Sequence, residues 1–298
     1  MGAVNTWNEF AVECFGFEIE VCNPRQAVAL SENPRIFRNI EDFWRFKEIW
    51  GESVESYDNF QHDIAFHFLT AKSLGVDGGA VRHGEAIDKD IFHKFFGQEE
   101  SPHGYLKEHF EKLGPHSFNQ SRHSMMLAYL VKNLDGKWSE DVSNLSYAEI
   151  GGGFGSFVRL MSKAYGFKEW TIYDMPYVLE LIDWFIGKNC PEVGEKVILI
   201  PTNQRDEHML RNSPNYDVVI GTHSWSELSM NEHAWYVNNL LPRSRYAFYV
   251  DQASWPHKTS TMDVKRQRIE AHMDLIDSML PTADYHCPMH FYKSKENR

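Results

Sequence analysis

Glu149-Ile-Gly-Gly-Gly-Phe-Gly155 is the most informative segment of this 298-residue chain. It ends a short apolar run at 145–150, which predicts a buried strand, and precedes 156–165, whose pattern predicts a helix. Glycines let a ligand approach the backbone closely, and the first turn of a helix presents free N–H groups. A strand, a glycine loop and a helix in this order predict a nucleotide-type ligand at the loop.

Two acidic residues narrow the class of ligand. The dinucleotide frame G-x-G-x-x-G/A requires Gly or Ala at position 156, where this chain has Ser156, so a nicotinamide oxidoreductase is a distant alternative. Glu149, two positions before the first glycine, is unfavourable beside a pyrophosphate. It suits a ligand that carries a sulfonium and an ammonium, through direct contact, through water or by shaping the loop. Asp174, 25 positions later, ends the next expected strand and can accept hydrogen bonds from ribose hydroxyls.

Strand and helix patterns alternate after residue 141. We expect a Rossmann-like, doubly wound α/β fold with a mostly parallel sheet. The expected strands are 145–150, 169–173, 196–201, 217–222 and 246–251, with closing strands in 285–292, and the expected helices are 156–165, 178–189, 231–240 and 261–280. Residues 141–298 would form the Rossmann-like domain that binds this ligand, and residues 1–140, which are rich in aromatic residues with helical periodicity, would form a mainly helical cap that binds a second substrate, the acceptor.

Two further segments carry a resemblance to known enzymes. Residues 173–178, Y-D-M-P-Y-V, resemble the D-[LM]-P-x-V stretch of several O-methyltransferase families. Residues 218–229, V-V-I-G-T-H-S-W-S-E-L-S, together with the glycine loop resemble class I S-adenosylmethionine-dependent methyltransferases, and among them the sugar O-methyltransferase family of bacterial and related glycan gene clusters. The resemblance covers about 145–251. It implies S-adenosylmethionine as cofactor and a sugar hydroxyl of a glycan or nucleotide sugar as acceptor.

A hydroxyl acceptor needs a base, because it is a poor nucleophile until its proton is removed. His223 is the first candidate, since it directly follows the fourth expected strand, on the ligand side of the sheet. Glu227 could orient the imidazole or bind sugar hydroxyls. Asp251 and His257 are alternative bases or sugar contacts. The competing interpretation of His223 is a structural histidine bonded to a neighbouring carbonyl.

Other residues are candidates by position or by type. Asn203 and Gln204 could read the adenine edge, or could form an ordinary polar loop. Trp225 and Trp255 could stack on a sugar, although plain packing explains each equally well. Arg122 and His123 are candidate acceptor contacts. The complete set of expected cofactor contacts is Glu149, Gly151, Gly152, Gly153, Gly155, Asp174, Met175, Asn203, Gln204 and Thr222.

Metal-independent chemistry is favoured. Magnesium would need clustered carboxylates, to which Asp251 and Glu227 could contribute, but no tight acidic pair follows the fourth or fifth strand. The histidines lack zinc-site spacing.

Composition excludes several classes of protein. The formal charge of −12 argues against a large nucleic-acid footprint or docking to an anionic membrane. Four cysteines without a C-x-x-C pair indicate free thiols, and no signal peptide or 18-residue apolar stretch is visible. We therefore expect a cytoplasmic protein without membrane insertion, and a homo-oligomer stays open. The rival functions are an O- or N-methyltransferase of a non-sugar small molecule, and a non-catalytic cofactor-binding module in a glycan-assembly complex.

Overall fold

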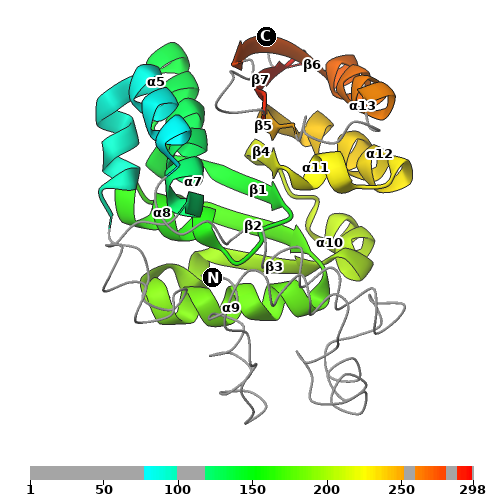
Figure 1. Ribbon diagram of the computed structural model, residues 1–298. Helices are drawn as coiled ribbons and strands as arrows, with labels where there is room; N and C mark the ends of the chain where they lie inside the picture. The colour runs from blue at the N-terminus through cyan, green and yellow to red at the C-terminus, as the bar shows by residue number, and fades with distance from the viewer. Residues whose placement is uncertain (1–76, 99–117, 252–258, 280–286, 297–298) are drawn as a thin grey trace, which may run out of the picture.

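A seven-stranded sheet forms the centre of the molecule, in the order β3-β2-β1-β4-β5-β7-β6 (Figure 1). The computed structural model describes residues 77–98, 118–251, 259–279 and 287–296. Strands β1 to β5 are parallel, and β7 runs antiparallel to both β5 and β6. This mixed, mostly parallel sheet confirms the predicted fold class. The strands are β1 (Ser146–Ile150), β2 (Glu169–Asp174), β3 (Val197–Pro201), β4 (Tyr216–Thr222), β5 (Ser244–Val250), β6 (Met273–Met279) and β7 (Met289–Ser294).

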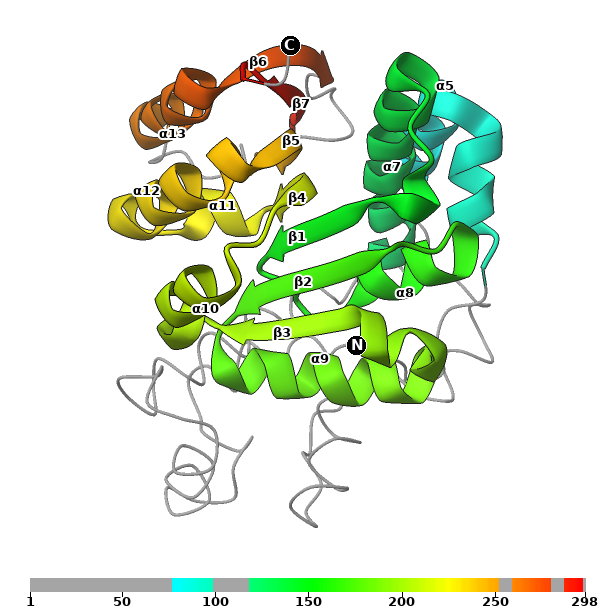
Figure 2. The same cartoon turned by 180° about the vertical axis from the view of Figure 1, so that it is seen from behind.

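Helices cover both faces of the sheet, which makes three layers (Figures 1 and 2). The first face packs against α5 (Gly78–Phe96), α7 (Phe118–Val131), α8 (Ser156–Ala164) and α9 (Pro176–Asn189). The second face packs against α10 (Arg205–Asn212), α11 (Ser224–Glu227), α12 (Met230–Asn239) and α13 (Thr259–His272). The strand order reverses between β1 and β4, and ligands of such sheets bind at that reversal, beyond the carboxyl ends of the strands.

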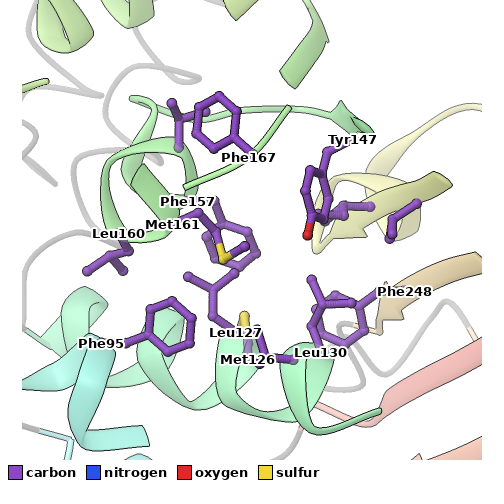
Figure 3. Packing of buried hydrophobic residues seen from close by; sticks show 14 of the residues in the cluster. Phe95, Met126, Leu127, Leu130, Tyr147, Phe157, Leu160, Met161, Phe167 and Phe248 are labelled. Atoms are coloured by element: carbon purple, nitrogen blue, oxygen red, sulfur yellow. The ribbon is translucent and has the colours of Figure 1, made fainter. Parts of the chain in front are cut away.

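The central strands are buried on both faces, as their continuous apolar runs predict. In β1, Tyr147 joins the core under α7 and α8, whereas its neighbour Ala148 joins the core under α10 to α12. The first core is dense in large side chains: Tyr147 stacks on Trp170 with ring centroids 4.6 Å apart (Figure 3 shows part of this cluster). Burial on both faces fixes the sheet as the middle layer.

Helix α7 belongs to this same core, although it was expected in the N-terminal cap. Residues 124–131 of α7 are buried, and Tyr129 packs against Phe248 of β5 with centroids 5.9 Å apart. The described N-terminal helices are therefore helical as expected, but they pack on a face of the sheet. The rest of the expected cap, residues 1–76 and 99–117, lies outside the described residues.

One element was predicted wrongly. The helix expected at 261–280 ends at His272, and Met273–Met279 forms β6 at the edge of the sheet. The apolar residues Met273 and Ile276 can be buried in either a helix or a strand, so the sequence pattern is ambiguous here. The segment forms a strand because β6 pairs with β7. Helix α10, after β3, was not expected at all.

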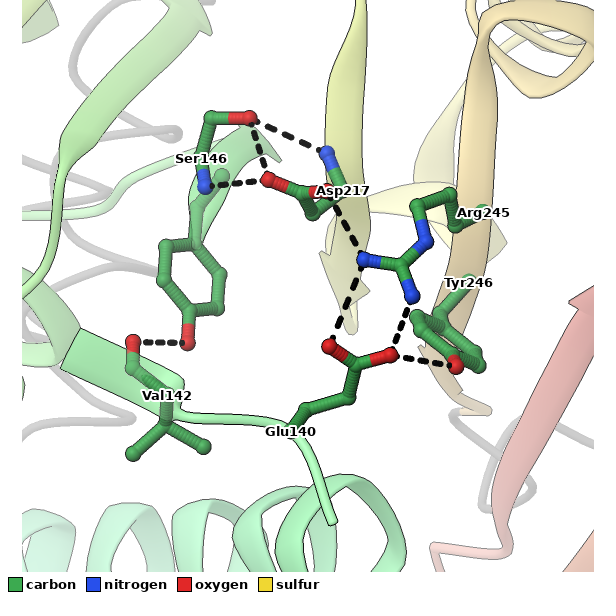
Figure 4. A network of polar contacts seen from close by, with 7 residues as sticks. Glu140, Val142, Ser146, Asp217, Arg245 and Tyr246 are labelled. Carbon is green, nitrogen blue, oxygen red and sulfur yellow. Dashed lines mark hydrogen bonds and ion pairs between the residues drawn. The ribbon is translucent and has the colours of Figure 1, made fainter. Parts of the chain in front are cut away.

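A polar network joins the amino-terminal ends of β1, β4 and β5, at the edge opposite the glycine loop (Figure 4). Asp217 Oδ2 accepts hydrogen bonds from the backbone N–H and the hydroxyl of Ser146, each 2.9 Å long. Arg245 bridges Asp217, at 3.2 Å, and Glu140. Glu140 also accepts a 2.9 Å hydrogen bond from the hydroxyl of Tyr246. This network joins the starts of three neighbouring strands.

No helix among the described residues combines the length and the apolar character that crossing a membrane requires. Cys190 is buried and Cys287 partly buried, and both are free thiols. Cys14 and Cys22 lie outside the described residues.

Candidate active site

The glycine loop makes the sharp turn from β1 into α8. Gly151, Gly153 and Gly155 have φ values of 79°, 59° and 87°, a region that L-residues with a side chain rarely adopt. The Gly151 N–H donates to the carbonyl of Tyr173 at 2.9 Å, and Gly155 caps α8 without any side-chain hydrogen bond. Helix α8 therefore begins without a side-chain cap, and the first N–H groups of a helix have no partner within the helix itself. Among the residues that the structure describes, nothing lies within 4 Å of a Cβ added to Gly153.

Asp174 connects the end of β2 to this loop. Its Oδ2 accepts a 2.8 Å hydrogen bond from the N–H of Gly152, and its Oδ1 accepts a 2.7 Å bond from the N–H of Met175. Asp174 is only partly buried. Its position at the carboxyl end of β2 matches the expectation, and Met175 beside it packs against the core under α9.

Glu149 lies deeper than expected. Its side chain is 2% exposed, and its Oε2 accepts a 2.9 Å hydrogen bond from the indole Nε1 of Trp170. Burial raises the pKa of this carboxyl to about 8, with a smaller contribution from nearby Asp174 and an opposing one from the Trp170 hydrogen bond. Because Trp170 belongs to β2, this hydrogen bond joins the end of β1 to β2, just before the glycine loop.

His223 occupies a strained strand-to-helix turn between β4 and α11. Its φ of 58° and ψ of −45° are unusual for a residue with a side chain, and such outliers gather at functional sites. The turn is fastened by its neighbours: the His223 carbonyl accepts from the N–H of Ser226 at 3.0 Å and also from the Ser226 hydroxyl. A sharp turn of this kind raises a side chain above the edge of a sheet.

The His223 turn lies directly against the glycine loop. The Ser224 hydroxyl donates to the carbonyl of Ile150. A Cβ added to Gly151 would lie 2.4 Å from the Cβ of Ser224, so only glycine allows this approach. The two segments that the sequence singled out therefore form one site, through a hydrogen bond between residues 74 positions apart. Thr222, at the end of β4, is partly buried beside them.

His123 joins the site from the start of α7. Its Nδ1 is 2.9 Å from the hydroxyl of Ser156, the first residue of α8, and its ring packs edge-on to Phe157 with centroids 5.0 Å apart. Burial first, then repulsion from His223 when that ring is also protonated, and then the charges of Arg122 and Arg159, together lower the pKa of His123 to about 3. The pKa of His223 falls to about 4, again through burial first and then through Arg122. Both imidazoles are neutral at physiological pH.

Arg122 lies next to His123 in the sequence and forms an ion pair with Asp77. Its Nε donates a 2.9 Å hydrogen bond to Asp77 Oδ2, and Asp77 in turn caps the start of α5. The backbone N–H of Asp77 donates to the hydroxyl of Ser121 at 3.0 Å. Arg122 therefore ties α5 to α7 and places a positive charge near the two histidines.

Trp225 is a correction to the sequence analysis. It was a candidate for stacking on a sugar, but it is 2% exposed and lies in the core on the second face of the sheet. It packs against His233 and Tyr249, with centroids 5.2 and 5.6 Å away. A Cβ on Gly221 would clash with its indole at 1.9 Å. Trp225 has the packing role that the alternative interpretation gave it.

The other candidates divide into three groups. Asn203 and Gln204 follow β3, as expected, and are exposed in the turn Thr202–Gln204. Asp251 follows β5 and is 5% exposed, with its N–H bonded to the carbonyl of Pro288 at 2.8 Å. Trp255, His257 and the side chain of Glu227 lie outside the described residues. Within the described ranges no group of three or more His, Cys, Asp or Glu side chains could hold a metal ion.

Sequence reasoning missed two serines of this site. Ser156 was noted only because it breaks the dinucleotide frame, yet it is the partner of His123. Ser224 was part of a quoted motif but had no role, although it joins the two loops. Ser156 directly follows the last loop glycine, Gly155, and that position is a local signal that could have marked it. Ser224 follows His223, whose positive φ is not visible in the sequence.

No protein-family model matches this chain, and no curated protein matches it. Solved structures match at low identity. The glycopeptide N-methyltransferase MtfA with S-adenosyl-L-homocysteine is 10% identical over 55% of this chain and 90% of its own, with a TM-score of 0.41. Magnesium protoporphyrin IX methyltransferase from Synechocystis PCC 6803, with bound SAM, is 12% identical over 93% and 99%, with a TM-score of 0.42. A candidate RNA methyltransferase from Pyrococcus horikoshii is 12% identical over 69% and 97%, with a TM-score of 0.45. The fold of this chain follows from its own strand order.

Proposed function

We propose that this chain is an S-adenosylmethionine-dependent methyltransferase whose reaction centre lies between the glycine loop and the His223 turn. The single observation that carries the proposal is the contact of these two segments at the carboxyl edge of the sheet, with Ser224 seated on Gly151. The neighbouring structures named above include methyltransferases solved with the cofactor or its product, and they have the same general fold.

The residues of the loop fit this cofactor. The open space at Gly153 and the uncapped N-terminus of α8 can receive the amino-acid part of the ligand, and Asp174 can receive the ribose hydroxyls. Asn203 and Gln204 lie exposed after β3, where they can meet the adenine edge. When bound, S-adenosylmethionine supplies an electrophilic methyl group on a sulfonium.

His223 is the proposed base. Its imidazole is neutral, so a ring nitrogen has a lone pair for the proton of an acceptor hydroxyl. A pKa near 4 makes it a weak base towards a neutral hydroxyl. It suffices for an oxygen that is already bonding to the methyl carbon, because that oxygen becomes strongly acidic as the new bond forms. His223 therefore removes the proton late, and positioning of the acceptor supplies much of the remaining rate.

The proposed acceptor is a sugar hydroxyl, as the resemblance of 218–229 implies. The two neutral histidines support an oxygen acceptor, because a neutral imidazole can take up the proton that a hydroxyl loses. His123 and Ser156 are the proposed acceptor contacts on the α7 side.

Calorimetry with S-adenosylmethionine, followed by a transfer assay with a labelled methyl group, tests the proposal. The acceptor panel holds sugar nucleotides, oligosaccharides and non-sugar alcohols and amines. We expect cofactor binding and label on a sugar hydroxyl. Label only on non-sugar acceptors would overturn the sugar part, cofactor binding without any transfer would favour a binding module, and absence of cofactor binding would overturn the whole proposal.

A further inference from the structure

We propose that Lys265 of α13 is a positioning residue that holds the His223 turn in its reactive shape from beneath the site. The inference rests on the function proposed for His223, but its test does not need methyl transfer. Lys265 lies on the second face of the sheet, and neither the spacing of the motifs nor the resemblance drew attention to it.

The ammonium group of Lys265 binds the loop that follows His223 at three points. Its Nζ donates to the carbonyls of Trp225 and Ser226, both at 3.0 Å, and to the carbonyl of Leu228 at 2.6 Å. A lysine ammonium has three N–H donors, and three carbonyls receive them here. These carbonyls belong to the end of the four-residue helix α11, where helical carbonyls have no partner of their own.

The connection from Lys265 to His223 passes through a single residue. Ser226 offers its carbonyl to Lys265, while its N–H and its hydroxyl both donate to the carbonyl of His223. Displacement of Ser226 would therefore release the His223 peptide. His223 has a backbone conformation that a side-chain-bearing residue does not hold unless its surroundings fix it.

A structural role alone does not explain the choice of lysine. Lys265 is 3% exposed, and burying an ammonium costs desolvation that an apolar side chain of similar length would avoid. The loop could be packed without a charge, as the buried Trp225 already packs it. A buried cation can offset its desolvation cost where it holds three carbonyls in one arrangement, because each charge-assisted hydrogen bond is strong and directional.

The location also suits a positioning residue. Lys265 reaches the loop from the face that holds α12 and α13, whereas His123 and Ser156 lie towards the opposite face. The lysine would therefore act on the proposed site through the turn, by way of the carbonyls of Trp225, Ser226 and Leu228.

The experiment observes the His223 imidazole directly by histidine side-chain NMR across pH, on the full-length chain labelled at histidine. His223→Ala assigns the His223 signals in the wild type. Lys265→Met removes the three donors and keeps the side-chain length. We expect the His223 signals to move and the pKa of His223 to rise towards the ordinary histidine range, because a released turn lets water reach the ring. The Kd for S-adenosylmethionine should stay within threefold.

Lys295→Met is the matched control. Lys295 also donates to a backbone carbonyl at α13, that of Glu270, but its side chain is 40% exposed and it lies far from the turn in sequence and fold. The His223 signals should not move in this variant. Lys265→Arg keeps the charge and should restore the wild-type signals in part.

Should Lys265→Met fail to fold, Lys265→Gln replaces it, because a neutral amide tolerates burial and can serve at most two carbonyls. Unchanged His223 signals in whichever of these two variants folds would overturn the proposal. If an acceptor is known, a fall of at least tenfold in kcat with unchanged KM for the cofactor supports it, and an equal kcat contradicts it. A wild type that binds no cofactor would defeat the proposed function while the NMR result for Lys265 still stands.

Discussion

The backbone N–H of Gly152 donates a 2.8 Å hydrogen bond to Asp174 Oδ2, and this bond joins the glycine loop to the end of β2. Asp174→Ala removes both this loop contact and the proposed ribose contact. We expect S-adenosylmethionine to bind roughly 10- to 100-fold more weakly, which corresponds to about 1.5–3 kcal/mol for hydrogen bonds to a charged group. Calorimetry with S-adenosylmethionine and S-adenosylhomocysteine measures the effect.

Asp183→Ala is the control for this change, because Asp183 is exposed on α9, the helix that follows Asp174. It should bind both ligands like the wild type. Equal cofactor affinity of Asp174→Ala and Asp183→Ala would remove Asp174 from the cofactor site.

The strained backbone of His223 lets its proposed catalytic role be separated from its structural one. Replacement by alanine or by glycine should each lower methyl transfer roughly 100- to 10,000-fold, the usual worth of a general base. The two variants should differ in stability. At a φ of 58° alanine keeps the steric penalty of an L-residue and glycine does not, so His223→Gly should melt at the same temperature as His223→Ala or higher.

Lys163, which is exposed in the last turn of α8, serves as the control, because there we expect the alanine variant to be more stable than the glycine variant. There glycine should be less stable than alanine by about 0.5–1 kcal/mol, the ordinary cost in a helix. Thermal melts of the four variants give the comparison. A His223→Gly protein that melts well below His223→Ala would contradict the strained turn.

Glu149 should make the protein less stable as pH rises. Its pKa is raised to about 8 by burial, above the value of about 4.5 in the unfolded chain. A raised pKa stabilises the fold fully below the unfolded value, and the contribution is lost as pH rises through the folded value. Glu149→Gln mimics the protonated acid and cannot ionise. We expect the variant to gain melting temperature relative to the wild type as pH goes from 5 to 9, with unfolding followed by circular dichroism. A difference that does not change with pH would mean that Glu149 stays ionised in the fold.

The sequence predicted the sheet well because each strand carries a local signal. The runs that became β1, β2 and β4 are apolar, bounded by turn residues and separated by helical periodicity, so their limits were correct within a residue or so. Residues 273–279 have no such local signal. They form β6 because they pair with β7, which follows later in the chain.

The candidate site could be predicted only where a single segment of sequence carries the signal. Glycine spacing marks the loop at 149–155, and the end of an expected strand marks Asp174. The meeting of His123 with Ser156, or of Lys265 with the loop after His223, joins residues 33 or more positions apart, and only the packing of α7 and α13 on the sheet creates it. The prediction that Trp225 stacks on a sugar was wrong for a related reason. Two positions after His223, it turns into the opposite face, and nothing in the order of residues distinguishes a stacking tryptophan from a buried one.

The network at the amino edge should control stability without touching the cofactor. Burial alone would raise the pKa of Asp217, but hydrogen bonds from Ser146 and the guanidinium of Arg245 hold it below its ordinary value. Asp217→Asn should therefore cost about 1 kcal/mol, an amount reduced by the solvent exposure of Arg245, and leave the cofactor Kd unchanged. A depressed pKa stabilises the fold above the unfolded value, and the gain is lost as pH falls through the folded value.

Urea denaturation at pH 7 and at pH 3 tests this prediction, with Asp263→Asn as the exposed control. The variant and the wild type should differ at pH 7 and converge in acid. A weakened cofactor Kd in Asp217→Asn would show that this edge of the sheet is coupled to the ligand edge, which the prediction excludes.

His123 should make the protein sensitive to mild acid. Burial first, then repulsion from a protonated His223, and then the charges of Arg122 and Arg159, lower its pKa to about 3, against about 6.5 in the unfolded chain. Stability from a depressed pKa is complete above the unfolded value, so the wild type should lose stability as pH falls from about 6.5 towards 3. His123→Gln keeps a polar partner for Ser156 but cannot take up the proton.

The variant should therefore lose less free energy of unfolding between pH 7.5 and pH 5 than the wild type does, as urea titrations at both values would measure. His93→Gln, at an exposed histidine of α5, is the control and should lose as much as the wild type. His223 has its own depressed pKa, so part of the acid loss should persist in His123→Gln and diminish further when His223 is also replaced. The two histidines share a corner in which a second positive charge would be repelled, and their effects on acid stability should not add. An acid loss in His123→Gln equal to that of the wild type would mean that His123 is accessible to water and not packed between Ser156 and Phe157.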